Sequence, residues 1–137
     1  MNGKAFLDTN ILVYFYSESE KDKQNTALSV LNRHECVTNI HAVCEASNVF
    51  MKKFKWNPTK VKKHLDNIEL VCDEILPVQR NTINKAIDIK DRYGFSFYDC
   101  LMLASALESD CQMIFTEDMS DGQIINDTLK IINPFAL

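Results

Sequence analysis

The stretch AFLDTNILVY, residues 5–14, places a single aspartate inside an otherwise apolar run. Burying an unpaired carboxylate is costly, and the group either finds a partner or takes up a proton. Asp8 therefore ends a buried strand and caps the helix that follows, or it lies against something positively charged; the two interpretations are compatible. We expect the strand to stop at Leu7 and the helix to begin near Thr9 or Asn10.

Further along the chain, short apolar runs alternate with segments of helical periodicity. Strands are predicted within residues 36–40, 70–78, 112–118 and 129–135, and helices over 22–33, 41–54, 57–68, 81–94 and 96–109. In the helix over 81–94, Ile83, Ala86 and Ile87 are expected to face inward, and Gly94 is expected to end it. This alternation predicts the α/β class: a three-layer α/β/α sandwich with a short, mainly parallel sheet covered on both faces.

The bulk properties indicate one soluble domain over residues 1–137, with 46% apolar and 25% charged residues. No apolar run approaches the length of a membrane span, and no export signal opens the chain, so we expect a cytoplasmic protein. Five cysteines, an odd number scattered through apolar runs, are typical of a reduced intracellular chain. The net charge of −4 shows no basic excess. It excludes little, because four acids gathered at a metal site would leave the remaining charge balanced.

Four acids stand in apolar surroundings: Asp8, Glu45, Asp99 and Asp118. Each alone has an ordinary explanation, such as a helix N-cap after a strand or, for Asp99, a capping box with Ser96. Together they are expected to converge at the carboxyl ends of the strands, where ligands bind to sheets of this type. Four carboxylates side by side raise one another's pKa values unless cations compensate them. Ligand sets made only of oxygen suit Mg²⁺ or Mn²⁺, which can promote phosphodiester cleavage.

The same residues carry a resemblance to a known family. FLDTNILVY, CEASNV, GFSFYDCLMLASALESDC, IFTEDMSDGQ and INPF, in this order, resemble the PIN-domain nucleases, and in particular their VapC-like branch of toxins. By this resemblance Asp8, Glu45, Asp99 and Asp118 are the catalytic, metal-binding acids. Asn10 and Thr116 are then supporting polar residues.

The resemblance also implies an activity and partners. It implies a Mg²⁺-dependent endoribonuclease, the toxin of a toxin–antitoxin pair, that cuts structured RNA such as transfer or ribosomal RNA. A cognate antitoxin protein and a homodimer are implied as well.

Two assignments stay open within this interpretation. The segment TEDMSDG offers Glu117, Asp118 and Asp121 as the fourth acid; Asp118 is favoured by its distance from the strand end, with Asp121 as a possible second ligand. A lysine-rich stretch with interleaved Phe54 and Trp56 suits RNA phosphates and bases, and its candidate RNA-binding residues are Lys52, Lys53, Lys55 and Lys60. The alternative is a solvated face with Trp56 packed beneath it.

Some of these residues also occur in sites of other functions. A zinc site could use His34, Cys36, His41 and Cys44, although their spacing lacks a tight knuckle. A haloacid-dehalogenase-type phosphatase needs a second aspartate at position 10, where this chain has Asn10. A receiver-like phospho-acceptor domain needs an acidic pair near the N-terminus, and Asp8 stands alone. A non-catalytic RNA-binding module on a PIN-like fold and an RNA-processing PIN nuclease without an antitoxin are the remaining alternatives.

Overall fold

A computed structural model describes residues 3–136 and contains a six-stranded sheet with the strand order β3-β2-β1-β4-β6-β5. The strands are β1 (Lys4–Leu7), β2 (Glu35–Asn39), β3 (Glu74–Leu76), β4 (Met113–Phe115), β5 (Ile124–Ile125) and β6 (Leu129–Ile132). The helices are α1 (Thr9–Tyr14), α2 (Lys21–Arg33), α3 (Ile40–Lys52), α4 (Pro58–Val71), α5 (Arg80–Tyr93) and α6 (Phe97–Glu108).

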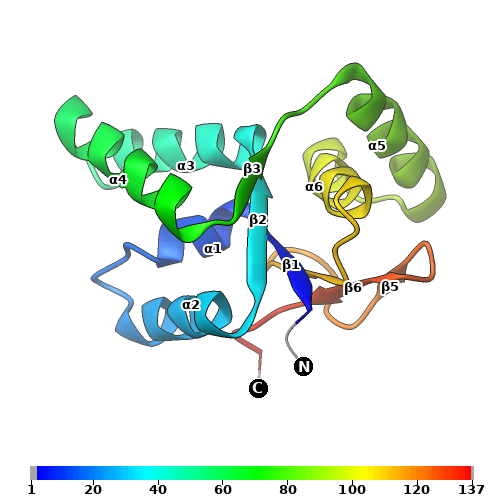
Figure 1. Ribbon diagram of the computed structural model, residues 1–137, viewed down its shortest axis with the longest axis horizontal. Helices are drawn as coiled ribbons and strands as arrows, with labels where there is room; N and C mark the ends of the chain where they lie inside the picture. The colour runs from blue at the N-terminus through cyan, green and yellow to red at the C-terminus, as the bar shows by residue number, and fades with distance from the viewer. Residues whose placement is uncertain (1–2, 137) are drawn as a thin grey trace.

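The sheet is parallel except for β5, which pairs antiparallel with β6. Helices α1 to α4 lie on one side of it and α5 and α6 on the other (Figure 1). The chain leaves β1 toward β2 and β3, then crosses to β4 on the opposite side of β1. This reversal creates a switch point between β1 and β4, where the two connections diverge and leave a crevice. The predicted three-layer α/β/α sandwich is confirmed.

Local sequence signals explain where several helices begin and end. Asp8 is the N-cap of α1, Asn57 caps α4 with Pro58 in the first turn, and Ser96 caps α6. Gly94 ends α5 in the left-handed conformation, with φ of 80°, and donates its N–H to the carbonyl of Lys90. These caps match the boundaries expected from the sequence.

Two sequence expectations need correction. Ile87 is 52% exposed and does not face the core, although Ile83 and Ala86 on the same helix do pack inward. The strand β5 was not expected, because its two residues are too short to give a periodic pattern.

The core lies between the sheet and both helical layers, and α6 is its most buried helix. Seven consecutive residues of α6, from Cys100 to Ala106, are buried. All five cysteines are free; Cys36, Cys72, Cys100 and Cys111 are buried, and Cys44 is exposed. Within residues 3–136 no helix is both long and apolar enough to cross a membrane.

Candidate active site

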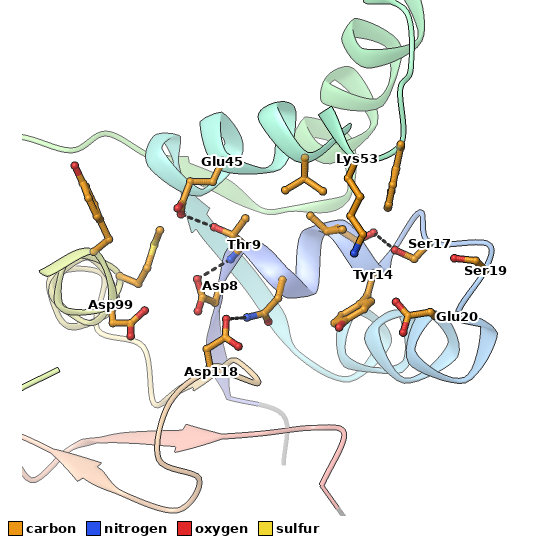
Figure 2. Close-up of a pocket in the computed structure, with 16 residues that line it drawn as sticks. Asp8, Thr9, Tyr14, Ser17, Ser19, Glu20, Glu45, Lys53, Asp99 and Asp118 are labelled. Carbon is orange, nitrogen blue, oxygen red and sulfur yellow. Dashed lines mark hydrogen bonds between the residues drawn. The ribbon is translucent and has the colours of Figure 1, made fainter. Parts of the chain in front are cut away.

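The four acids singled out in the sequence line one pocket of about 340 Å³. Asp8 follows β1, Asp118 lies beyond β4, Glu45 is on α3, and Asp99 is in the first turn of α6. Four segments that are distant in sequence therefore bring their carboxylates to the switch point of the sheet. Figure 2 shows these side chains gathered around Asp8, whereas Lys53 and Glu20 lie farther along the pocket.

Asp8 is the most enclosed of the four, with only 6% of its surface exposed. Its Oδ1 accepts the backbone N–H of Thr9 at 2.7 Å, and its Oδ2 accepts the hydroxyl of Thr116 at 2.7 Å. Burial raises its pKa from the ordinary 3.8 to about 6, and the charges of Asp99 and Asp118 push in the same direction against those two hydrogen bonds. Asp8 is thus a helix cap, and within residues 3–136 its carboxylate has no salt bridge to a lysine or arginine.

The acid on the β4 side is held by the first turn of α1. The Nδ2 of Asn10 donates to Oδ2 of Asp118 at 2.9 Å, and the backbone N–H of Asp118 donates to the Thr116 hydroxyl at 3.1 Å. The same hydroxyl donates to Oδ2 of Asp8, so Thr116 links the carboxylate of Asp8 to the backbone of Asp118. Asn10 and Thr116 therefore contact the acids that they were expected to support.

Glu45 is held by a residue that the sequence reasoning did not single out. The hydroxyl of Thr9 donates to Oε1 of Glu45 at 2.8 Å, which links α1 to α3 (Figure 2). The Nε2 of His41, one turn earlier on α3, lies 3.5 Å from the same oxygen and has no hydrogen-bond partner in the part of the chain described. The sequence could have indicated Thr9 by its position directly after Asp8, because a hydroxyl at the start of a helix can reach a neighbouring segment.

Asp99 lies at the N-terminus of α6, where its backbone N–H donates to the Ser96 hydroxyl at 3.3 Å. Burial raises the pKa of the Asp99 carboxyl, with further contributions from Asp118 and Glu45, while Ser96 works against the rise. Ser96 therefore caps α6 as expected, and this cap leaves the Asp99 carboxylate at the pocket.

The donor set fits a hard divalent cation. All four side chains offer carboxylate oxygens, the ligands that Mg²⁺ and Mn²⁺ prefer, and no salt bridge within residues 3–136 joins Asp8, Asp99 or Asp118 to a lysine or arginine. In that same range no three His, Cys, Asp or Glu side chains lie close enough together to enclose an ion as they stand. The four carboxylates line the pocket but stay apart from one another. Repulsion between like charges favours this separation.

The two other acids after β4 have different partners. The carboxylate of Glu117 accepts hydrogen bonds from the hydroxyl of Tyr14 and, at 2.9 Å, from the ammonium of Lys23. Burial acts to raise the pKa of Glu117, but these two hydrogen bonds outweigh it and the net shift is downward. Asp121 accepts the backbone N–H of Asn133 at 2.8 Å and does not line the pocket. Asp118 is therefore the acid of this segment that lies with the other three.

The lysine-rich stretch divides into two parts. Lys53 lines the same pocket as the acids. Trp56 stacks on Phe50 with ring centroids 4.6 Å apart, and the ammonium of Lys60 lies 4.5 Å from the Trp56 ring centroid. Trp56 is therefore packed in a cluster, as the alternative interpretation expected, while Lys52, Lys53, Lys55 and Lys60 are all exposed.

The candidate zinc residues do not assemble. Cys36 is buried, Cys44 is exposed, the ring of His34 packs against Phe115, and the ring of His41 stacks on Tyr98. The finding that no three His, Cys, Asp or Glu side chains group together in residues 3–136 applies to this set as well. The arrangement thus offers no zinc site among these residues.

Comparisons with known proteins identify the fold and the family. The structure is similar to a chain of a toxin–antitoxin complex from Klebsiella pneumoniae, with a TM-score of 0.72 and 17% identity over 97% of this chain and 99% of that one. It is also similar to Mycobacterium tuberculosis VapC20, described as a Sarcin-Ricin loop cleaving toxin, with a TM-score of 0.65 and 17% identity over 83% and 91% of the two chains.

A third similar structure is a chain of VapBC2 from Rickettsia felis, bound to a DNA fragment from its promoter. Its TM-score is 0.65 at 14% identity, over 95% of this chain and 99% of that one. No curated protein matches the sequence. The PIN domain family model matches residues 5–120, which is most of the chain. The chain therefore belongs to the PIN-domain family and has the fold of VapC-type toxins.

Proposed function

We propose that this protein is a metal-dependent endoribonuclease in which Asp8, Glu45, Asp99 and Asp118 hold Mg²⁺, or alternatively Mn²⁺. The observation that carries the proposal is the gathering of these four carboxylates in one pocket at the switch point of the sheet. Asp8 strengthens the proposal, because burial raises its pKa to about 6 and no lysine or arginine within residues 3–136 forms a salt bridge with it. A bound divalent ion would supply the missing positive charge.

Each polar neighbour has a definite task in this proposal. The bound ion would supply the positive charge that activates water and stabilises the leaving oxygen of the phosphodiester. Thr116 fixes Oδ2 of Asp8, Asn10 fixes Oδ2 of Asp118, and Thr9 fixes Oε1 of Glu45. Because Thr9 N–H also holds Oδ1 of Asp8, the protein fixes both oxygens of Asp8 and one oxygen each of Glu45 and Asp118. These three acids therefore keep their orientation while the charge in the pocket changes.

The substrate and partner are proposed from the structural neighbours. VapC20 is described as a toxin that cleaves the Sarcin-Ricin loop, and the two other neighbours belong to toxin–antitoxin complexes. We propose that this protein is likewise a toxin that cuts structured RNA, either ribosomal or transfer RNA, in the cytoplasm. Its cognate antitoxin would block the pocket, and its functional state would be a homodimer, which light scattering of the purified protein can test.

The RNA backbone needs positive charge outside the acid cluster. Lys53 is the lysine best placed for this role, because it lines the pocket away from Asp99 (Figure 2). The exposed ammonium groups of Lys52, Lys55 and Lys60 are proposed to extend that contact along the surface, each neutralising a phosphate.

Cleavage of total RNA tests the proposal. Purified protein is incubated with total RNA in Mg²⁺ and in EDTA, and the Asp99→Asn variant is run beside it. Asp121→Asn is the matched control, because it makes the same chemical change at an acid outside the pocket and keeps the oxygen that accepts the N–H of Asn133.

We expect discrete fragments only when Mg²⁺ and Asp99 are both present, and unchanged cleavage by Asp121→Asn. Full activity of Asp99→Asn contradicts the assignment of the acids. RNA binding without cleavage, by a folded protein and in every condition, favours the non-catalytic RNA-binding module.

A further inference from the structure

One aromatic side chain of this protein is exposed, and it lies at the acidic pocket. The chain has eight phenylalanines, four tyrosines and one tryptophan, and within residues 3–136 only Tyr98 among them is exposed, at 57%. Tyr98 lines the pocket and directly precedes Asp99 in α6. Core packing does not explain this position, since the other aromatic side chains are at least partly buried.

The Tyr98 ring is held in a fixed orientation although it is exposed. It stacks on the imidazole of His41 with centroids 4.8 Å apart and an interplanar angle of 3°. Phe97 contacts it edge-on, with centroids 5.4 Å apart and an angle of 73°. His41 covers one face of the ring, so the exposed area includes the opposite face. An aromatic ring ordered before binding loses little conformational entropy when a ligand stacks on it.

Electrostatics also limits how RNA can bind beside these acids. The four carboxylates repel the phosphates of any strand that approaches without a cation. Lys53 attracts phosphate, but it lies along the pocket away from Asp99 (Figure 2). Within residues 3–136 no lysine or arginine lines the pocket beside Asp99, so an interaction that does not require positive charge would add attraction there. Stacking between an aromatic ring and a nucleobase meets this condition.

We propose that Tyr98, supported by His41, is a stacking platform for a nucleobase that flanks the phosphodiester held at the acids. The proposal rests on the proposed function, because it takes RNA as the ligand. It adds a contact that orients the strand: the flanking base stacks on the Tyr98 side and the backbone continues toward Lys53. Because every nucleobase offers a flat face, this contact is tolerant of sequence.

Binding measured with an intact probe tests the platform separately from cleavage. The probe is a fluorescein-labelled single-stranded oligoadenylate dodecamer. Its dissociation constant is measured by fluorescence anisotropy in Ca²⁺, which offsets the charge of the acids, and again in EDTA, with gel analysis to confirm that the probe stays intact. The variants are Tyr98→Ala, which removes the ring, and Tyr98→Phe, which keeps the ring and removes the hydroxyl. Ile87→Ala is the control, since Ile87 is similarly exposed at 52% but lies on α5 outside the pocket.

We expect Tyr98→Ala to raise the dissociation constant roughly 5- to 150-fold, the equivalent of about 1–3 kcal/mol for one stacked base. Tyr98→Phe and Ile87→Ala are expected to stay within a factor of two of the unaltered protein. A second probe is a fully abasic dodecamer, which keeps the phosphates and has no base to stack. The effect of Tyr98→Ala should vanish for this probe, which a purely structural defect does not reproduce.

The outcomes separate the two proposals. Equal dissociation constants for Tyr98→Ala and the unaltered protein overturn the platform, even if the protein cleaves RNA in Mg²⁺. Absence of oligoadenylate binding by the unaltered protein in both Ca²⁺ and EDTA overturns it as well. Binding that depends on Tyr98, from a protein that cleaves no RNA, supports the platform and removes the nuclease assignment.

Discussion

Glu117 and Asp118 are consecutive in sequence, yet the chain treats their charges in opposite ways. The Glu117 carboxylate receives hydrogen bonds from Tyr14 and from the ammonium of Lys23, and its pKa is lowered. Asp118 turns into the pocket with Asp8, where its one side-chain hydrogen bond comes from the neutral amide of Asn10. We call the first group, Lys23, Tyr14 and Glu117, the paired cluster, and the four pocket acids the acid cluster.

The difference identifies which acids stabilise the fold and which are available for chemistry. In the paired cluster the chain supplies its own cation, so the charge is neutralised within the folded protein. In the acid cluster the hydroxyls of Thr116 and Thr9 and the amide of Asn10 are the side-chain donors, with the imidazole of His41 3.5 Å from Glu45. The pKa values of Asp8 and Asp99 are raised. Asp8 is buried and has no lysine or arginine partner within residues 3–136, and strongly perturbed groups in a cleft are typical of functional sites. We propose that this uncompensated charge is the site of an external cation.

The largest expected effect is the loss of cleavage in Asp8→Asn. Removing one ligand charge weakens metal binding and the stabilisation that the ion gives to the leaving oxygen, so cleavage should fall roughly 10²-fold or more. Initial rates on the RNA fragment found with total RNA measure this. Glu117→Gln is the comparison in the paired cluster and is expected to stay within a few-fold of the unaltered rate. Equal losses in both variants would break the distinction between the clusters.

The two clusters should also respond to pH in opposite directions. The pKa of Asp8 is raised from 3.8 to about 6 in the folded protein, so its carboxylate destabilises the metal-free fold as pH rises through this window. The difference corresponds to about 3 kcal/mol, which is the upper limit of what Asp8→Asn can recover above about pH 6. Urea unfolding in EDTA, at pH values on both sides of this window, measures it.

For Glu117 the sign is reversed. Its pKa is lowered from 4.5, so its pairing stabilises the fold at higher pH and this stabilisation is lost as pH falls below 4.5. Near neutral pH Glu117→Gln should therefore be less stable than the unaltered protein and Asp8→Asn more stable, and both differences should shrink in acid. Parallel pH profiles for both variants would contradict the comparison.

A smaller effect is expected from Lys23→Met. This change removes the cation of the paired cluster and keeps an apolar stem near Tyr14 and Phe135, over whose rings the ammonium lies 4.8 Å and 5.5 Å from the centroids. Because Lys23 and Glu117 are partly exposed, at 36% and 23%, the free energy of unfolding should fall by only about 1 kcal/mol. Denaturant unfolding at neutral pH measures this loss, and Mg²⁺ binding measured on the same samples should not change.

The smallest effect concerns Lys53, the cation that shares the pocket with the acids. If it neutralises one phosphate, Lys53→Ala lowers the slope of log affinity against log salt by about 0.7 for single-stranded RNA. Titrations of the oligoadenylate dodecamer at several salt concentrations determine the slope. Lys85→Ala, on the opposite side of the sheet in α5, should leave it unchanged. An unchanged slope in Lys53→Ala would remove this lysine from the RNA contact.

The sequence was sufficient to predict the fold class and the four pocket acids. Apolar strands that alternate with helices allow only a few topologies. Asp8 was conspicuous because burying a charge inside an apolar run is costly unless the charge is compensated. Helix caps such as Asn57 and Gly94 act within one turn, so the local sequence also contained them. Ile87 was wrongly predicted to face inward. The sequence of a helix with one buried face does not define where that face ends, and Ile87 lies just outside it.

The contacts that hold the site could not be predicted in the same way. Lys23 reaches Glu117 across 94 positions, and Thr9 reaches Glu45 across 36. Such pairs depend on how the helices pack on the sheet, which periodicity does not specify. The distinction between Glu117, Asp118 and Asp121 likewise depends on where one loop turns, and only the structure shows which side chain enters the pocket.

Metal binding by Asp8→Asn tests the central claim most directly. Mn²⁺ is titrated by calorimetry into metal-stripped protein and into the Asp8→Asn and Glu117→Gln variants, near neutral pH. If the uncompensated charge of the acid cluster is the cation site, the unaltered protein and Glu117→Gln bind Mn²⁺ alike, and Asp8→Asn loses most of the binding. Equal binding by all three proteins, or none by the unaltered one, would contradict the account.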